Sequence, residues 1–390
     1  MSVEKVIVVG AGVAGLTAAL SFAQKGARVD ILEQTAVLSE VGAGLQISAN
    51  AARILDRLGV LGELSPKWTE PETVTLAAGS SLKDLASVLI GDSGKARWGA
   101  PYGVLHRATL QAALIAAVEA QPNCTLHLGV RVDAPSIEKL EEISGERADI
   151  IVGADGVWSR LRKIVPGAGT ARFSGFVAWR FLVPMDQAPA FLPRNRVTAF
   201  TGADAHIVTY PLKEANAFNL VAITRGRDPG EAWSVVPTEQ QRHEFVDRAL
   251  KSWHPDIKAL LINAPTPTWW PLFGVTPGNW TDGERVALVG DAAHAMLPFA
   301  AQGAAMAIED AHDLACLAMR MPVKDALHAY QALRKPRVEK VKARGDFNRF
   351  AYHARGPVRI ARDLVLASRP AARLAADLDW IYGYRAGDTV

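Results

Sequence analysis

The alternation of apolar and polar positions predicts a strand, a helix and a second strand at the start of the chain. Residues 5–9 form a continuous run rich in valine and isoleucine, which is typical of a strand buried on both faces. Apolar residues recur at helical spacing over 13–25, Gly26 ends that run, and residues 28–32 have the pattern of another buried strand. This order predicts a βαβ unit.

A glycine-rich turn joins the first strand to the helix. Gly10, Gly12 and Gly15 are spaced as in nucleotide-binding turns, where the first turns tightly, the second admits a pyrophosphate and the third packs helix on strand. Glu33 follows Gly10 by 33 − 10 = 23 residues, near the spacing of a carboxylate that binds an adenosine ribose. These features predict a dinucleotide site, with NAD and FAD both open. The alternative is a glycine-rich turn of an unrelated α/β protein.

Two later strands also end at a carboxylate. Residues 148–154 have the pattern of a buried strand that leads to Asp155, and residues 285–290 that of another leading to Asp291. A nicotinamide dinucleotide needs one nucleotide fingerprint, whereas a flavin adds ribityl hydroxyls and a ring that becomes anionic on reduction. Asp291 suits the hydroxyls, and a helix predicted over 302–319 would direct its first N–H groups at the ring. The sequence therefore favours a flavin.

Between these motifs the pattern changes to short strands separated by turn residues, over 176–183, 197–200, 206–210 and 219–224. Strands inserted in a nucleotide-binding frame predict a second, sheet-based domain, with the substrate between it and the flavin. We therefore expect an α/β (α+β) protein. Its parts would be a Rossmann-like FAD-binding domain over 1–75, 100–170 and 275–345, a substrate-binding β-sheet domain over 76–99 and 171–274, and a C-terminal helical segment over 346–390.

Charge and composition narrow the range of partners. Lys+Arg minus Asp+Glu is 43 − 40 = +3 in 390 residues, too little to indicate nucleic acid or an anionic membrane. The two cysteines, Cys124 and Cys316, lie in no metal-binding pattern, so we expect no metal and a reducing compartment. The apolar run from Val6 to Ala23 is long enough for a membrane span but is divided by glycines. We expect a cytoplasmic protein with a small-molecule partner.

The three motifs together resemble those of the group A flavoprotein aromatic hydroxylases, the family of salicylate hydroxylase, 3-hydroxybenzoate 6-hydroxylase and 6-hydroxynicotinate 3-monooxygenase. Residues 10–15 resemble the first FAD motif, Asp155-Gly156 the DG motif and residues 290–298 the GD motif. Residues 42–47 resemble the mobile flavin loop of this family, and Arg107 its FAD-contacting arginine. The resemblance covers nearly the whole chain.

The resemblance implies a fold of the p-hydroxybenzoate-hydroxylase type with FAD as the cofactor. The residues that it places around FAD are Gly10, Gly12, Ala14, Gly15, Glu33, Gln34, Gly44, Gln46, Arg107, Val130, Asp155, Asp291, Pro298, Gly303 and Ala304. Tyr330, Arg334 and Arg337, with residues 379–384, are similar to closing stretches of the salicylate-hydroxylase branch. Residues 270–277 depart from that branch, in which many members carry Arg or Asp before the proline.

Three side chains are candidates for the chemistry. His206 and Tyr210 lie four apart on a predicted strand and so share one face, where they could hold a phenol and take its proton. By resemblance they fall on the HxxxYP pattern of the family, whereas the alternative is a polar pair satisfied within a sheet. The amide of Gln302 could donate to a substrate or a peroxide, or it could cap a helix. His294 fits a structural role better than a catalytic one.

The resemblance implies a single-component aromatic monooxygenase. NADH or NADPH would reduce the flavin, O2 would form a flavin C4a-hydroperoxide, and its terminal oxygen would add to a phenolic or carboxylated ring. The sequence has no second nucleotide fingerprint, so the nicotinamide would bind transiently. Alternatives on the same fold are a flavin epoxidase or halogenase and a non-catalytic binding protein, as in Rab GDP-dissociation inhibitors. We expect a monomer or a homodimer.

A stretch rich in Lys and Arg runs over 334–349, with acidic residues interleaved at Glu339 and Asp346. Such a pattern is typical of a solvated helix face, which we expect here. It could instead attract NAD(P)H or an anionic substrate.

Overall fold

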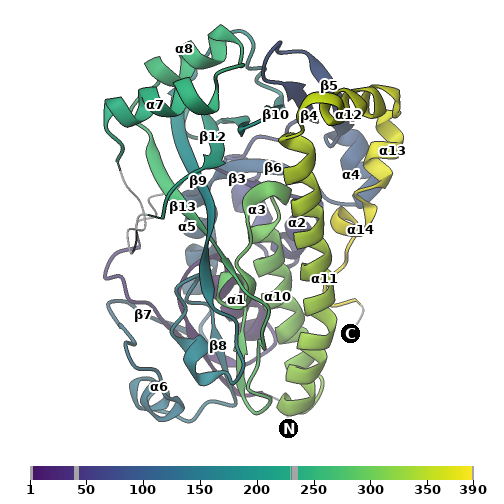
Figure 1. Cartoon of the computed structure of the whole chain (residues 1–390). Coiled ribbons are helices and arrows are strands. Elements are labelled where there is room, and N and C mark those ends of the chain that lie inside the picture. Colours follow the sequence, from purple (N-terminus) through teal and green to yellow (C-terminus); the bar gives the residue numbers. More distant parts are fainter. Residues whose placement is uncertain (1–2, 39–43, 229, 231–235, 389–390) are drawn as a thin grey trace.

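The structure, a computed structural model, describes residues 3–38, 44–228, 230 and 236–388. Within these ranges two main sheets are surrounded by helices (Figure 1). The first sheet is parallel throughout, with five described strands in the order β14-β8-β1-β2-β7. These strands are β1 (Lys5–Val9), β2 (Arg28–Leu32), β7 (Cys124–His127), β8 (Ile150–Gly153) and β14 (Val286–Leu288).

The predicted βαβ unit is confirmed. β1 pairs in parallel with β2, and α1 (Val13–Ala23) connects them. Every residue of β1 is buried, as expected for a parallel strand with both faces covered. α1 is buried almost all round because it packs against α5 (Arg107–Glu119) and α10 (Gly303–Ala318). The core of this half therefore lies between the parallel sheet and these helices.

The second sheet is larger and is antiparallel except where β4 pairs with β10. Its strand order is β13-β9-β12-β11-β10-β4-β5, and α7 and α8 cover one face (Figure 1). The strands are β4 (Thr73–Ala78), β5 (Asp84–Leu89), β9 (Ala171–Pro184), β10 (Arg196–Thr201), β11 (Ala205–Leu212), β12 (Ala217–Arg225) and β13 (Thr268–Val275). A short ladder pairs β3 (Gly44–Ile47) with β6 (Gly103–His106).

A long helix, α11 (Val323–Tyr352), runs beside both halves of the molecule (Figure 1). Its 30 residues correspond to about 45 Å. It continues through residue 346, where the sequence predicted a boundary, and the predicted domain ranges stay a prediction. The remaining helices are α2 (Ala49–Arg57), α3 (Leu61–Leu64), α4 (Asp92–Trp98), α6 (Ile137–Ser144), η1 (Leu161–Ile164), α7 (Glu239–Ala249), α8 (Pro255–Asn263), α9 (Asp291–His294), η2 (Pro298–Ala300), α12 (Gly356–Ser368), α13 (Ala371–Ala376) and α14 (Asp379–Tyr382).

A buried ion cluster joins α10 to α11. The side chain of Arg334 pairs with Glu309 at 2.7 Å, with Asp310 at 2.8 Å and with Asp313 at 3.4 Å, and all four are fully buried. Arg337 also pairs with Glu309, at 2.7 Å. The expectation of a solvated basic face was therefore wrong for these two arginines. Three carboxylates on a buried helix require cations, and α11 supplies them.

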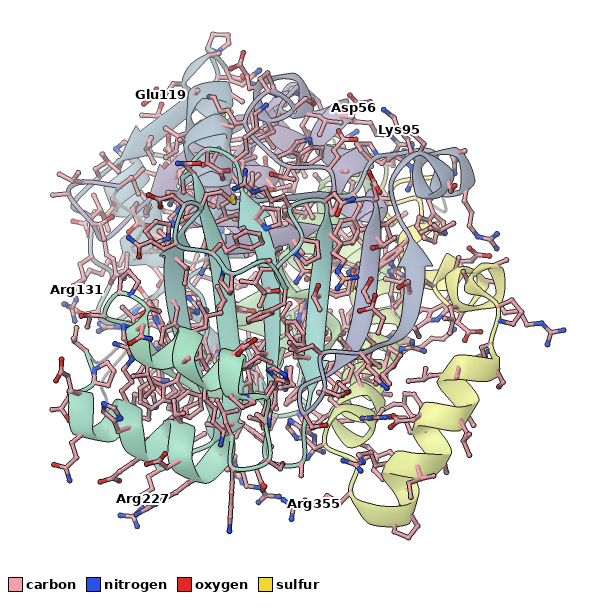
Figure 2. The ribbon with its side chains drawn as sticks, turned by 90° about the horizontal axis from the view of Figure 1, so that it is seen from above. Asp56, Lys95, Glu119, Arg131, Arg227 and Arg355 are labelled. Carbon is pink, nitrogen blue, oxygen red and sulfur yellow. The ribbon has the colours of Figure 1, made fainter. Side chains whose placement is uncertain are left out.

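The exposed charges lie at the edge of the molecule. Figure 2 shows labelled side chains such as Arg131, Arg227 and Arg355 pointing outward from the ribbon. None of the helices in the described ranges has both the length and the apolar character needed to cross a bilayer.

Candidate functional site

The glycine-rich turn has a different steric reason for each glycine. A Cβ on Gly10, where φ is +104°, would lie 2.5 Å from the carbonyl oxygen of Ala154. A Cβ on Gly15 would lie 1.9 Å from the carbonyl oxygen of Gly10, so this glycine allows α1 to pack on the turn. A Cβ on Gly12 would meet nothing within 4 Å. The backbone at Gly12 therefore faces open space, as a phosphate-binding turn requires.

A cavity of about 610 Å³ opens at this turn. It lies where β1, β2, β8 and β14 of the parallel sheet end, because the carboxyl ends of parallel strands meet at one edge. The predicted cofactor residues that line it are Gly10, Gly12, Glu33, Gln34, Arg107, Val130, Asp155 and Asp291. We call this cavity the nucleotide cleft.

The carboxylates of the nucleotide cleft shape its loops and leave acceptors free. Glu33 accepts a hydrogen bond from the Ala11 N–H at 2.8 Å, so its carboxylate holds the glycine-rich turn. One oxygen of Asp155 accepts from the Arg160 N–H at 2.7 Å. The other oxygen of Asp155 is buried, with no hydrogen-bond partner among the described residues. Asp291 is exposed in the cleft at the start of α9. These acceptors fit the hydroxyls of FAD.

The N-terminus of α10 also faces open space. A Cβ on Gly303 would meet nothing within 4 Å, and Ala304 follows in the first turn. The helix thus offers free N–H groups and the positive end of its dipole, which fits a ring that becomes anionic on reduction. A Cβ on Gly290, which precedes α9, would lie 3.1 Å from the Cβ of Ala14. Ala14 therefore packs against the GD motif.

The side chain of Gln302, which precedes α10, is buried and already bonded. Its Nε2 donates to the Ser48 hydroxyl at 3.0 Å, and its Oε1 accepts from Asn50 Nδ2 at 3.3 Å. Asn50 Nδ2 also donates to Glu309 at 2.7 Å, which connects this group to the ion cluster. The amide of Gln302 therefore holds the start of α10 against α2, and its predicted contact with substrate stays a prediction.

A second cavity, of about 480 Å³, lies between the large sheet and the C-terminal helices. We call it the substrate cavity. His206 of β11 lines it with Gln46 of β3 and Pro298 of η2, and α11 closes one side. The ring of His206 lies 5.0 Å from Phe299 and 5.2 Å from Tyr352, measured between ring centroids. Two predicted cofactor residues and one predicted catalytic residue thus meet in one mostly apolar space.

His206 is a neutral group in this cavity. Its Nδ1 lies 3.2 Å from Nε2 of His353, within hydrogen-bond distance. Burial, followed by the neighbouring His353, lowers the pKa of His206 to about 3. Burial likewise lowers the pKa of His353 to about 4. Neither ring is therefore charged near neutral pH.

Tyr210 is not among the residues that line the substrate cavity. Four residues along β11 correspond to about 13 Å between Cα atoms, so His206 and Tyr210 share a face, and their joint action on one substrate stays a prediction. Tyr210 packs against β3: a Cβ on Gly44 would lie 2.5 Å from its ring, which is why glycine is needed there. Burial raises the pKa of Tyr210. Gly42, the other loop glycine predicted to matter, lies outside the described residues.

Sequence reasoning missed several residues of the substrate cavity. Tyr102, Tyr352 and Tyr382 line it, and His353 holds His206. Arg344, which belongs to the basic stretch that could attract an anionic substrate, lines it as well. Arg344 and Tyr352 lie eight residues apart on α11, and this helical spacing was the available signal. It could not reveal which sheet the helix would cover.

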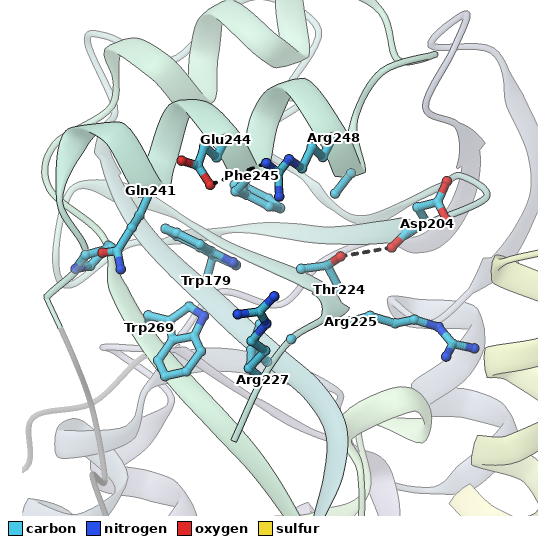
Figure 3. Close-up of a pocket in the computed structure, with 14 residues that line it drawn as sticks. Trp179, Asp204, Thr224, Arg225, Arg227, Gln241, Glu244, Phe245, Arg248 and Trp269 are labelled. Atoms are coloured by element: carbon cyan, nitrogen blue, oxygen red, sulfur yellow. Dashed lines mark hydrogen bonds and ion pairs between the residues drawn. The ribbon is translucent and has the colours of Figure 1, made fainter. Parts of the chain in front are cut away.

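A third cavity, of about 540 Å³, lies on the other face of the large sheet (Figure 3). Trp179 and Trp269 are cross-strand partners there, and Trp179 stacks on Phe245 with ring centroids 4.6 Å apart. Arg227, which is exposed, also lines this cavity (Figure 3). Because successive side chains alternate across a sheet, this cavity is separated from His206 by the sheet itself.

Comparisons with known proteins agree with this geometry. A family model described as an FAD binding domain matches residues 4–344. The chain is 34% identical to 3-hydroxybenzoate 6-hydroxylase 1 of Aquipseudomonas alcaligenes, over 97% of this chain and 98% of that one. It is 32% identical to 6-hydroxynicotinate 3-monooxygenase of Bordetella bronchiseptica, over 86% and 88% of the two chains.

Solved structures match as well. A salicylate hydroxylase substrate complex superimposes with a TM-score of 0.78 at 24% identity, covering 99% of this chain and 97% of that one, which shows the same fold. The family model spans both the nucleotide cleft and most of the large sheet. The chain therefore belongs to the FAD-binding domain family, and FAD is its cofactor.

Proposed function

We propose that the protein is an NAD(P)H-consuming monooxygenase that hydroxylates a phenolic or carboxylated aromatic ring. The observation that carries the proposal is the substrate cavity, in which neutral His206 faces an apolar space beside Gln46 and Pro298. Relatives at 32–34% identity are named as hydroxylases and monooxygenases of hydroxybenzoate and hydroxynicotinate. In the net reaction a ring C–H, O2, NAD(P)H and a proton become a ring C–OH, NAD(P)+ and water.

The residues of this chain would hold the ring and exclude water. FAD, when bound, supplies the redox chemistry and the activation of O2. In the tautomer whose Nδ1–H donates to His353, the Nε2 of His206 accepts a hydrogen bond from a substrate hydroxyl. Its low pKa keeps it an acceptor, so His206 orients the hydroxyl and draws electron density towards the ring. Tyr210, farther along β11, would act on the loop at Gly44.

The test is oxidation of NADH and of NADPH by the FAD-loaded protein. A panel of hydroxybenzoates, aminobenzoates and hydroxypyridine carboxylates would be added singly, with hydroxylated product and hydrogen peroxide measured alongside. We expect one class of ring to raise the rate of NADH or NADPH oxidation and to release little hydrogen peroxide. The reason is that a mostly apolar cavity excludes water from the site of oxygen transfer. The two nucleotides compared in parallel identify the preferred reductant.

Other outcomes would contradict the proposal. Stimulation by alkenes or by halide, with the corresponding epoxide or halogenated ring, would favour an epoxidase or a halogenase on this fold. A protein that retains FAD and oxidises neither nucleotide with any substrate would favour a binding role. We further propose that the protein is cytoplasmic and that it is a monomer or a homodimer. Sedimentation of the FAD-loaded protein would test the oligomeric state.

A further inference from the structure

Three arginines line the substrate cavity, and two of them are neutralised. Arg362 pairs with Asp363 at 2.6 Å, and Arg369 pairs with Asp377 at 2.8 Å. Arg344 has no carboxylate within 4 Å among the residues that the structure describes. Its Nε is buried and makes no hydrogen bond to any of them. Arg344 is therefore a half-buried cation whose charge is not compensated by the described protein.

Arg344 lies on the same face of α11 as Tyr352, whose ring lies against His206. Arg344, Phe347, Asn348, Ala351 and Tyr352 all line the cavity, and their spacing forms one stripe along α11. Arg344 lies about 12 Å along the helix axis from Tyr352. The ring of Tyr352 lies against His206. The cavity thus has an acceptor for a hydroxyl near one end of this stripe and a free cation towards the other.

The carboxylate that lines the substrate cavity, Asp377, is paired with Arg369. Arg344 itself lies over the Phe347 ring, 5.8 Å from its centroid, and near tyrosine hydroxyls. Burial raises the pKa of both Tyr352 and Tyr382, and the charge of Arg344 opposes the rise in each case, so both phenols stay neutral. The hydroxyl of Tyr102 already donates to Gln46 at 2.7 Å. β13 (Thr268–Val275) carries no charged residue. A guanidinium in an apolar cavity with neutral neighbours is stabilised by an anionic ligand.

We propose that Arg344 binds the carboxylate of the substrate, which makes the substrate a ring that carries both a carboxylate and a hydroxyl or amino group. This inference rests on the proposed function, because it assigns the ligand of the same cavity. The planar guanidinium would form two parallel hydrogen bonds to the carboxylate, while the hydroxyl lies towards Nε2 of His206. Arg344 would thereby set which end of the ring faces the oxygenating centre.

The test measures binding separately from turnover. Dissociation constants of the FAD-loaded protein would be determined from the change in flavin absorbance, for one hydroxylated benzoate and for the matching benzamide. Wild type should bind the carboxylate about tenfold to a hundredfold more tightly than the amide, as charge-assisted hydrogen bonds predict. Arg344→Gln should reduce that preference to about twofold or less and leave amide binding unchanged. Arg373→Gln, an exposed arginine of α13 outside the cavity lining, is the charge-matched control and should keep the preference.

The outcomes separate this inference from the proposed function. Equal loss of carboxylate and amide binding in Arg344→Gln would overturn it, because a structural role would affect both ligands. Wild type that hydroxylates the amide as well as the acid would also overturn it while the proposed function stands. Failure of every ring to stimulate oxidation would contradict the function, whereas the ratio of dissociation constants would still test Arg344. If Arg344→Gln loses FAD, Arg344→Lys decides: it keeps the charge without the planar fork, and carboxylate binding alone should weaken severalfold.

Discussion

At the scale of single residues, the glycine-rich turn separates folding from cofactor binding. Gly15→Ala would place a Cβ 1.9 Å from a backbone oxygen, so we expect it to destabilise the protein without FAD by about 1–3 kcal/mol. Gly12→Ala meets no protein atom, so this variant should unfold like wild type but bind FAD at least tenfold more weakly. Urea unfolding of the FAD-free proteins and titration with FAD would measure the two effects.

Gly12→Ala and Gly15→Ala serve as controls for each other. Both changes add one methyl group close to the same turn, at the N-cap of α1 for Gly12 and in its first turn for Gly15, so the composition of the two variants is matched. A Gly12→Ala protein that binds FAD with wild-type affinity would remove the backbone at Gly12 from the cofactor site. Unchanged unfolding of Gly15→Ala would mean that α1 can shift away from the turn.

The same residues show why part of the site was predictable. Gly10, Gly15 and Glu33 are close in sequence, and their spacing follows from one turn between a strand and a helix. Arg344 of α11 and His353, which follows that helix, lie more than 130 residues after β11. Only the packing of the helix brings Arg344 to the substrate cavity and His353 to His206. Local patterns carry no information about such distant contacts.

At the scale of elements, the ion cluster between α10 and α11 should dominate the stability of the nucleotide-binding half. Arg334→Leu would leave Glu309, Asp310 and Asp313 buried without their main cation. Breaking a buried charge pair costs about 3–5 kcal/mol, and we expect a loss of that size in urea unfolding at pH 8. The loss should be smaller at pH 5.5, because these carboxylates would then take up protons.

The pH comparison distinguishes charge from packing. Lys335→Leu removes a neighbouring, partly exposed cation and should change stability by less than about 0.5 kcal/mol at either pH. An Arg334→Leu protein with the same loss at both pH values would show that lost packing, and not uncompensated charge, is responsible.

Element prediction succeeded where the local pattern was strong. The strands expected over 5–9 and 28–32 are β1 and β2, and the helix expected over 302–319 is α10. β13 was not predicted, because its tryptophans and proline obscure the alternation typical of strands. α11 continues through Pro336, which a sequence pattern normally treats as a break. Its packing against both halves offsets the lost hydrogen bond.

At the scale of the whole molecule, buried histidines should make the protein sensitive to acid. Burial lowers the pKa of His312 to about 4, as it does for His353, and that of His206 to about 3. Unfolding raises each towards 6.5, so the unfolded chain binds more protons and stability falls as the pH drops below about 6.5. Each histidine contributes a slope of about 1.4 kcal/mol per pH unit in that range. Asp313, whose pKa burial raises to about 6, opposes this slope with one proton.

One substitution isolates the contribution of a single histidine to this pH dependence of stability. His312→Leu lies away from the cavities and should flatten the dependence of unfolding free energy on pH, between about pH 6 and pH 4.5, by about 1.4 kcal/mol per unit. Comparing the slopes of unfolding free energy against pH, and not the free energies themselves, removes any loss of stability from the substitution that is the same at every pH. Parallel curves for wild type and variant would show that His312 is protonated in the folded protein.

The overall class was predictable, but its assembly was not. An α/β chain with a parallel nucleotide-binding sheet and an inserted sheet follows from the order of the strands, and the structure shows both sheets. The parallel pairing of β4 with β10 joins segments more than 115 residues apart, and no local pattern specifies it. Contacts of such high sequence separation are decided by the packing of the whole chain.

The contacts between α10 and residues 384–387 affect the order in which parts of the protein can fold during synthesis. Asp313 of α10 accepts hydrogen bonds from the Tyr384 hydroxyl at 2.9 Å and from the Gly387 N–H at 2.7 Å, and 74 residues separate Asp313 from Gly387. A nascent chain therefore exposes the glycine-rich turn long before residues 384–387, which donate hydrogen bonds to the buried Asp313, leave the ribosome. Until then this carboxylate of α10 lacks two of its hydrogen-bond donors.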